Sequence, residues 1–513
     1  MQIAANSMLS ATLGRAMTDM RSTFDDLTRQ LSSGKVSDTY GGLGTGRSTS
    51  LAMRAKLSQF TGYQNTITTV NTRLSLVSTN LTHVADLGSE QRSDTDPSVS
   101  TVIANGQTRA QVDARSRLDE ALSVLGADFA GSYVFGGRAT DHNPVESSGK
   151  ILDGDGTKVG LRAVITERRA ADLGTVGPDG LGNDQVGRLN VGANSGSSFN
   201  IAEDGVHSFG FKLSGGASTV AGATVSTPTG SPPSLDIGMT QQASDGQTFR
   251  LTVTLPDGTS DDLTMTASSA AIATDGSQFQ IGATVSDTLD NLRSAILTQL
   301  GTESRTTLAA ASSVVAAQGF FAAGPNTPPK RVDLTPPATL ATATSLRDAT
   351  PTDTVVWYTG DDDPNVTARN SSTAQVDNGI TVSFGVRANE EGVAKVVRTL
   401  ALYAAEVYPP GDADAAKRNS ALSDRVRSAL EPKTDAGTIT AISAELATAQ
   451  DSATAAKSRL DVASNTAQDL IDSVEKADDQ TVAASIMTVQ TRLQASYQTS
   501  ALLAKMSLVN YMG

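Results

Sequence analysis

A glycine-rich loop at residues 41–48 has the residue types that could bind a phosphate group. The loop nearly matches a phosphate-binding P-loop, but Arg47 stands where that motif requires lysine. A P-loop also follows a β-strand, which aims the loop at the phosphates, whereas the residues before this loop have a helical pattern. We therefore interpret residues 41–48 as a flexible turn and not as a nucleotide site.

Two acidic clusters have the oxygen ligands that a divalent cation prefers. Residues 153–156 alternate aspartate and glycine like the start of a calcium-binding EF-hand loop, but the glutamate that ends a twelve-residue loop is missing. Residues 361–363 are three aspartates directly before Pro364, and this run is most simply a solvated loop. We expect a metal ion at neither cluster.

The three histidines could act as ligands or as general bases. His83 lies in a helical pattern, His142 in a polar loop and His207 near a glycine-rich strand. They lack the i, i+4 spacing of a metal-binding pair, and the chain has no cysteine to join them. We find no catalytic constellation, so we expect no enzymatic activity and no cofactor; an enzyme housed in the middle of the chain has no pattern to support it.

Composition limits the kinds of partner. The 513 residues carry a net charge of −14, which argues against nucleic acid and against an anionic membrane surface. No apolar run reaches the roughly eighteen residues that span a bilayer, so we expect no membrane insertion. The first seven residues lack a basic region and an apolar core, so we expect no classical signal peptide. The absence of cysteine suits a chain that must travel unfolded.

The strongest pattern in the chain is an apolar seam between residues 446 and 477, which predicts one long helix. Its members recur in alternating steps of three and four, and no glycine or proline interrupts them. The seam consists of Leu446, Ala449, Ala453, Ala456, Leu460, Ala463, Ala467, Leu470, Val474 and Ala477. Because most of these residues are alanine, a partner helix can come close, but each contact buries little surface.

The other end of the chain supplies the expected partners. One N-terminal helix carries Leu13, Met17, Met20, Phe24, Leu27 and Leu31 at the same spacing. A second carries Phe60, Tyr63, Ile67, Val70, Leu74, Val77, Leu81 and Val84. After residue 479 the C-terminal seam resumes with Val482, Ile486, Val489 and Leu493. We expect these seams to form an antiparallel bundle and to be the assembly interface.

The middle of the chain has a different texture, rich in Gly, Thr, Ser and Pro. We expect a helix at about 98–129, a short strand at 131–137 and a β-hairpin followed by a helix at about 245–302. A Pro-rich connector at 326–337, strands at 355–358 and 380–386, and helices from 391 and at 420–430 should follow. The sequence thus predicts an α+β fold: a long antiparallel coiled-coil stalk from residues 1–140 and 391–513, with β-rich outer domains inserted at 141–390.

Both ends of the chain resemble the bacterial flagellins. Residues 31–36, placed between two long helices, resemble the N-terminal signature of that family. Residues 475–479 and 490–497 are similar to its acidic step and its Gln- and Ala-rich C-terminal helix. The resemblance covers about residues 1–140 and 390–513. Each motif alone is weak, but their occurrence at both ends, in order, is fairly specific.

Two departures from the filament-forming members of the family bear on the type of subunit. Residues 131–141, with Pro144 following, and residues 507–511 are more similar to the hook-associated hook–filament junction proteins of the same family. Residues 87–92 lack the basic run by which host innate receptors recognise many flagellins. The resemblance therefore leaves open a junction protein or a filament flagellin.

The family implies a structural subunit of the bacterial flagellum that serves swimming motility. Its members pass through a type III export channel with their terminal helices largely unfolded, and these helices fold on self-assembly outside the cell. The implied partners are copies of the chain in a helical assembly, neighbouring axial proteins such as hook-associated proteins and flagellin, and an export chaperone. The alternative from a different class is a secreted adhesin or binding module whose coiled-coil stalk is a spacer.

Overall fold

The computed structural model describes residues 2–178, 184–432 and 437–512. About half of the chain is helical (52%) and 17% is strand, so the expected α+β class is confirmed. Packing divides the chain into two units. Unit 1 contains Met1–Val70, Ala374–Val382 and Asp451–Gly513, and unit 2 contains Asn71–Thr373 and Ser383–Gln450. These divisions differ from the expected domain boundaries near residues 140 and 390.

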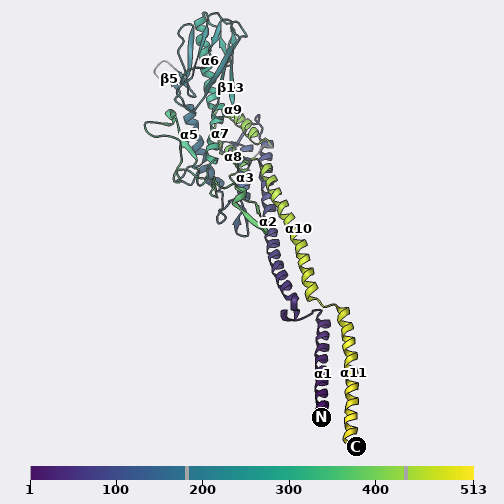
Figure 1. The fold of residues 1–513 in the computed structure, drawn as a ribbon. Helices are drawn as coiled ribbons and strands as arrows, with labels where there is room; N and C mark the ends of the chain where they lie inside the picture. The colour runs from purple at the N-terminus through teal and green to yellow at the C-terminus, as the bar shows by residue number, and fades with distance from the viewer. Residues whose placement is uncertain (1, 179–183, 433–436, 513) are drawn as a thin grey trace. The chain divides into compact units, whose positions relative to one another are not determined.

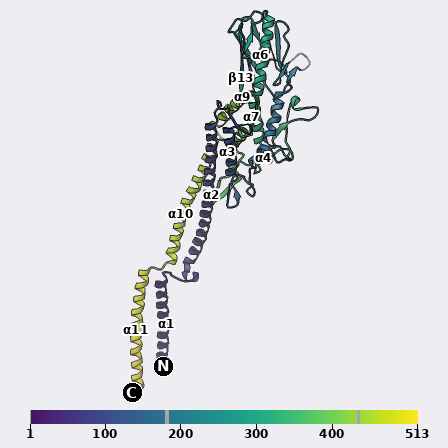
Figure 2. The same ribbon diagram turned by 180° about the vertical axis from the view of Figure 1, so that it is seen from behind.

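Unit 1 consists mainly of long helices from the two ends of the chain. They are α1 (Gln2–Ser33), the 3₁₀ helix η1 (Tyr40–Gly46), α2 (Arg47–Asp94), α10 (Ile439–Glu475) and α11 (Asp479–Met512). Helix α1 lies beside α11 with the two chain termini at the same end, and α2 lies beside α10 (Figures 1 and 2). A hairpin of β17 (Thr373–Asp377) and β18 (Ile380–Ser383) completes the unit. Helices α2 and α10 contribute residues to both units.

Unit 2 contains two larger sheets. The first has, in spatial order, β10 (Ala223–Val225), β11 (Ser234–Met239), β8 (Ser198–Glu203), β7 (Leu189–Val191), β6 (Asp184–Val186) and β5 (Gly177–Pro178). The second has β14 (Gln278–Gln280), β13 (Ser260–Ser268), β12 (Thr248–Thr254) and β9 (Lys212–Ser218). Neighbouring strands are antiparallel, except that β14 runs parallel to β13.

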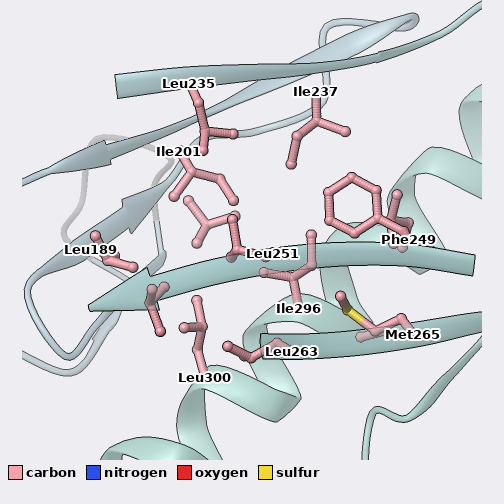
Figure 3. Close-up of a cluster of buried hydrophobic side chains, with 14 of the residues drawn as sticks. Leu189, Ile201, Leu235, Ile237, Phe249, Leu251, Leu263, Met265, Ile296 and Leu300 are labelled. Atoms are coloured by element: carbon pink, nitrogen blue, oxygen red, sulfur yellow. The ribbon is translucent and has the colours of Figure 1, made fainter. Parts of the chain in front are cut away.

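Both sheets share one hydrophobic core with helix α6 (Val285–Arg305). Figure 3 shows side chains from the two sheets and α6 converging on one another, among them Ile201, Leu251 and Ile296. On β12 and β13 every second residue is buried, as the period-2 side-chain alternation of a strand requires. The expected hairpin and helix at 245–302 therefore appear as β12, β13 and α6, within a larger two-sheet structure.

The helical part of unit 2 packs beside this core. It contains α3 (Arg109–Leu125), α4 (Ser148–Asp153), α5 (Leu161–Leu173), α7 (Thr307–Phe321), α8 (Glu391–Ala405) and α9 (Ala415–Ala429). The short elements are β1 (Val102–Ala104), β2 (Gln107–Thr108), β3 (Asp128–Phe129), β4 (Ser132–Tyr133), β15 (Lys330–Val332), η2 (Leu340–Thr342), β16 (Leu346–Asp348) and η3 (Arg369–Ser371). Among the described residues, no helix is both long and apolar enough to cross a membrane.

The expected single helix at 98–129 is wrong. Hairpin β1–β2 precedes α3, and hairpin β3–β4 follows it, so the expected strand at 131–137 is reduced to Ser132–Tyr133. Asn105 and Gly106 have φ angles of 52° and 74°, the left-handed geometry that a two-residue hairpin turn requires. The Asn-Gly dipeptide is itself a hairpin signal, and it outweighs the helical spacing here.

Helix α2 continues past Gly88 to Asp94. A Cβ atom at Gly88 would lie 3.3 Å from Val396 of α8 and 3.6 Å from Leu430, so the glycine permits close packing instead of ending the helix. Residues 355–358 form no strand; Tyr358 makes an isolated bridge with Val145. The expected connector at 326–337 contains β15.

Candidate assembly surface

The two long helices α2 and α10 are antiparallel. In unit 1, Gln64 donates a hydrogen bond to Asp461 at 2.7 Å, whereas Arg54, earlier in α2, bonds Glu475, later in α10. The seam of α10 that the sequence predicted lies along this pair of helices. Within unit 1 its buried members are Ala453, Ala456, Leu460 and Ala467 on α10, with Ile67 and Val70 on α2. The seam is continuous but thin, because most of its α10 members are alanine.

The predicted seam residue Leu470 is not in the seam. Its side chain is 43% exposed, whereas the neighbouring Ile471 is 3% exposed and takes the buried position. A straight helix with 3.6 residues per turn drifts by about 20° per heptad relative to a strict 3.5-residue repeat. The next buried residue after Ala467 is Ile471, four positions later, and not Leu470, three positions later. This longer step compensates for the drift. The next predicted member, Val474, is half-buried.

The pair α1 and α11 is less well buried within one chain. The predicted α1 residues Leu13, Met17, Met20, Phe24 and Leu27 are all half-buried. Leu31 is 42% exposed, which contradicts a buried position within the single chain. On α11, Val482 and Leu493 are buried, and Ile486 and Val489 are half-buried. This pair therefore leaves much of its apolar seam accessible.

The remaining predicted residues lie in unit 2 and are buried there. They are Leu74, Val77 and Leu81 on α2 and Leu446 on α10. The predicted set is thus divided: its central members are fully buried inside one chain, and its members near the chain ends are not.

Apolar side chains that the periodic pattern did not select point outward from the helices of unit 1. Val462 is 67% exposed, Met487 69% and Leu502 62%. Tyr497 and Leu51 are also largely exposed. They stand between seam positions, so a search for one stripe overlooks them. With Leu31 and Leu470, they give these helices apolar contact points on faces that the chain itself does not cover.

A polar junction joins the two helix pairs of unit 1. Residues 34–36 lie against residues 475–477: Val36 N–H donates to the carbonyl of Glu475 at 2.8 Å, and Ala477 N–H donates to that of Gly34 at 2.9 Å. Gly34 has φ +67°, a left-handed conformation that ends α1 there.

Glu475 is the centre of this junction. Its carboxylate accepts hydrogen bonds from Arg54 Nε at 3.0 Å and Arg54 Nη2 at 2.6 Å, and also from the Ser50 hydroxyl. The hydrogen bonds from Arg54 and Ser50 lower the pKa of Glu475 to about 2. The carboxylate is therefore charged at neutral pH and ties the start of α2 to the end of α10.

The glycine-rich loop at 41–48 does not form a phosphate cradle. It forms η1 between two helices, as a turn would, and has no preceding strand. A Cβ at Gly46 would lie 2.4 Å from Val474, so this glycine lets η1 pack directly on α10.

The acidic clusters have structural roles. Asp155 accepts hydrogen bonds from the backbone N–H groups of Thr157 and Lys158, which is a turn. The expectation that residues 361–363 are a solvated loop is wrong for Asp361, whose side chain is 10% exposed and accepts hydrogen bonds from Arg138 and Arg387. Within the described part of the chain, no group of three or more His, Cys, Asp or Glu side chains could hold a metal ion.

The histidines are separate from one another. His83 contacts Glu120 at 2.7 Å, and His142 contacts Asp141 at 2.8 Å. The side chain of His207 is buried, and its Nε2 lies 2.7 Å from Asp204 Oδ1. Burial lowers the pKa of His207, and the positive charge of Arg188 lowers it further.

No protein-family model matches the chain, and no curated protein matches it. The flagellin resemblance therefore stays a prediction from the residues at the two ends of the chain.

Proposed function

We propose that the chain is a non-enzymatic structural subunit of the bacterial flagellum that self-assembles through its terminal helices, as a hook–filament junction protein or as a filament flagellin. The observation that carries this proposal is the incomplete burial of unit 1. Pair α1–α11 leaves its seam half-exposed, and Val462, Met487 and Leu502 point outward.

A free-energy comparison supports coupled folding and assembly. Burying a methyl-sized group contributes about 0.8 kcal/mol, whereas fixing the backbone of one residue costs about 1–2 kcal/mol. A half-buried seam in α1 does not offset that cost within one chain. Neighbouring copies in a helical assembly would bury the outward residues as well, and the gain adds up over many lateral contacts.

In this proposal the antiparallel helices form a coiled-coil stalk, and the β-rich part of unit 2 forms outer domains. The free subunit keeps α1 and α11 largely unfolded for export, with a chaperone, and orders them outside the cell against copies of itself and neighbouring axial proteins. A chain without cysteine cannot cross-link on that route.

Assembly of purified variants tests the mechanism. Leu460→Asp places a charge in the buried seam of unit 1, and we expect it to abolish assembly while the sheets of unit 2 stay folded. Ser458→Asp is the matched control, because Ser458 is exposed on the same helix, and it should still assemble. Normal assembly of Leu460→Asp would refute the mechanism.

Immunogold electron microscopy with an antibody to residues 145–385 tests the function itself. Label along the whole filament indicates a filament flagellin, and label only at the hook end indicates a junction protein. Label on the cell surface with none on any flagellum would overturn the proposal in favour of the adhesin alternative.

A further inference from the structure

Unit 2 contains a pocket that the assembly role does not use. The pocket has a volume of about 650 Å³ and lies between the β12–β13 turn and helices α7, α8 and α9. Volumes of roughly 300–1,000 Å³ are usual for small-molecule sites. Its apolar lining includes Leu255, Val314, Leu402 and Val426.

The pocket is where the core-facing rows of two strands end. On β12 the buried row runs through Phe249, Leu251 and Val253 and reaches Leu255, which lines the pocket. On β13 the corresponding row is Ala267, Met265 and Leu263, and the next residue on that face is Asp261. Because side chains alternate between the two faces of a strand, Asp261 lies on the apolar face.

A carboxylate on the core-facing row breaks the binary pattern of this strand. Burial raises the pKa of Asp261, and the nearby charge of Glu303 raises it further. In the described residues, the Asp261 carboxylate has no ion pair and no hydrogen bond from a side chain. Such a departure from a consistent pattern costs stability and is typical of a functional position.

The nearby Asp257 differs from Asp261 in this respect. Arg425 of α9 donates to Asp257 Oδ2 from Nε at 2.6 Å and to the Thr259 hydroxyl from Nη2 at 3.1 Å. Burial alone would raise the pKa of Asp257, but hydrogen bonds from Thr259 and the charge of Arg425 lower it. Asp257 and Arg425, which both line the pocket, therefore connect the hairpin turn to α9.

The other charged side chains that line the pocket have both signs. Asp261 and Asp424 are acidic, and Lys395 and Arg398, both on α8, are basic. Arg398 Nη2 also donates to Glu391 of the same helix at 3.0 Å, and its guanidinium has further N–H donors for a ligand. A simple cation or a simple anion would meet repulsion from one pair, whereas a molecule with both charges can be paired by both.

We propose that this pocket binds a small zwitterion with an apolar body, of the class of an amino acid or a short peptide with free termini. The ammonium group pairs with Asp261, the carboxylate is bound by Arg398 and Lys395, and the apolar body lies on Leu255 and Leu402. The proposal concerns unit 2 alone and holds whether or not the chain is a flagellar subunit.

Calorimetric titration of the full chain with the dipeptide L-leucyl-L-leucine tests the site. We expect saturable binding that falls at least tenfold when the amino group is acetylated or the carboxylate is amidated, since each change removes one charge-assisted contact. No saturable binding up to about 10 mM, or equal binding of the blocked dipeptides, would overturn the proposal.

Two neighbouring variants make the test specific. Asp261→Asn should weaken dipeptide binding at least tenfold, and Asp262→Asn should change it by less than about twofold, because Asp262 points to the opposite, exposed face. Asp261→Asn should also leave the unfolding temperature unchanged or raised. If it lowers that temperature and leaves dipeptide binding unchanged, Asp261 is a structural residue and the proposal fails.

Discussion

Replacing Leu460, Leu470 and Ile471 by alanine, one at a time, tests how the seam of α10 is built. If α10 followed a strict heptad repeat, Leu460 and Leu470 would both be buried in the seam and Ile471 would lie outside the seam. The structure instead buries Leu460 and Ile471, which are 2% and 3% exposed, and leaves Leu470 43% exposed.

The expected magnitudes follow from these exposures. Leu→Ala removes three carbon atoms, so at about 0.8 kcal/mol for each buried CH₂ the transfer free energy lost at Leu460 is about 2.4 kcal/mol. Any cavity left behind adds to this. Ile471→Ala should cost a similar amount. Leu470→Ala should cost about 1 kcal/mol or less, because nearly half of that side chain is already in water and no enclosed cavity forms.

Backbone hydrogen exchange in α10 of the free chain measures these differences. A loss of 2.4 kcal/mol corresponds to roughly 50-fold faster exchange, and a loss of 1 kcal/mol to about fivefold. The reasoning is refuted if Leu470→Ala accelerates exchange as much as Leu460→Ala while Ile471→Ala has no effect. In the assembly proposal, Leu470→Ala should instead weaken polymerisation, since its side chain would contact a neighbouring copy.

Three further predictions concern charged groups. Because the pKa of Glu475 is lowered from 4.5 to about 2, its contribution to stability is present above pH 4.5 and is lost as the pH falls toward 2. Thermal melts of Glu475→Gln should lack this part of the acid dependence. The substitution should lower the free energy of unfolding by about 1 kcal/mol, since solvent screens the charge of Arg54. Asp361→Asn leaves the guanidinium of Arg387 without its 2.7 Å partner and should lower the unfolding free energy of unit 2 by about 2–3 kcal/mol, measured by urea unfolding. The pKa of His207 is lowered below 6.5 in the folded chain, so folding favours its neutral form. The free energy of unfolding should therefore fall as the pH drops below 6.5. An NMR titration that gives His207 a pKa at or above 6.5 would contradict this.

The sequence predicted the long helices well because their stabilising pattern is local. Gly34 ends α1, and the three-and-four spacing continues through most of α10. The sequence did not reveal α5, because Arg168 and Arg169 look like solvated residues. In the structure Arg168 bonds the buried Asp172 at 2.7 Å, and Arg169 bonds Glu406, so their charges are compensated by partners that the sequence alone does not identify.

The candidate assembly surface was predictable only in part. Periodicity selects one stripe on a helix, so it found Leu460 but gave no reason to select Val462, which stands two positions later and is 67% exposed. Ile471 is buried in place of Leu470 because the seam drifts gradually around a helix with 3.6 residues per turn. A pattern with a fixed repeat does not include this drift, so it selects Leu470. Asp261 could have been found from the alternation of β13, since it is the one charged residue on the row that continues through Leu263 and Met265.

The two units bury apolar surface in different ways, and this difference connects the fold to the proposed function. Unit 2 has cores with large side chains, such as the Trp357 ring whose N–H donates to the Phe321 carbonyl at 2.9 Å within a fully buried site. Each such residue contributes several times the free energy of an alanine methyl group. Unit 1 relies on alanines and on half-buried residues such as Met17. A chain built this way can keep one unit folded by itself while the helices at its ends depend on neighbouring copies, which is the division of stability that assembly after export requires.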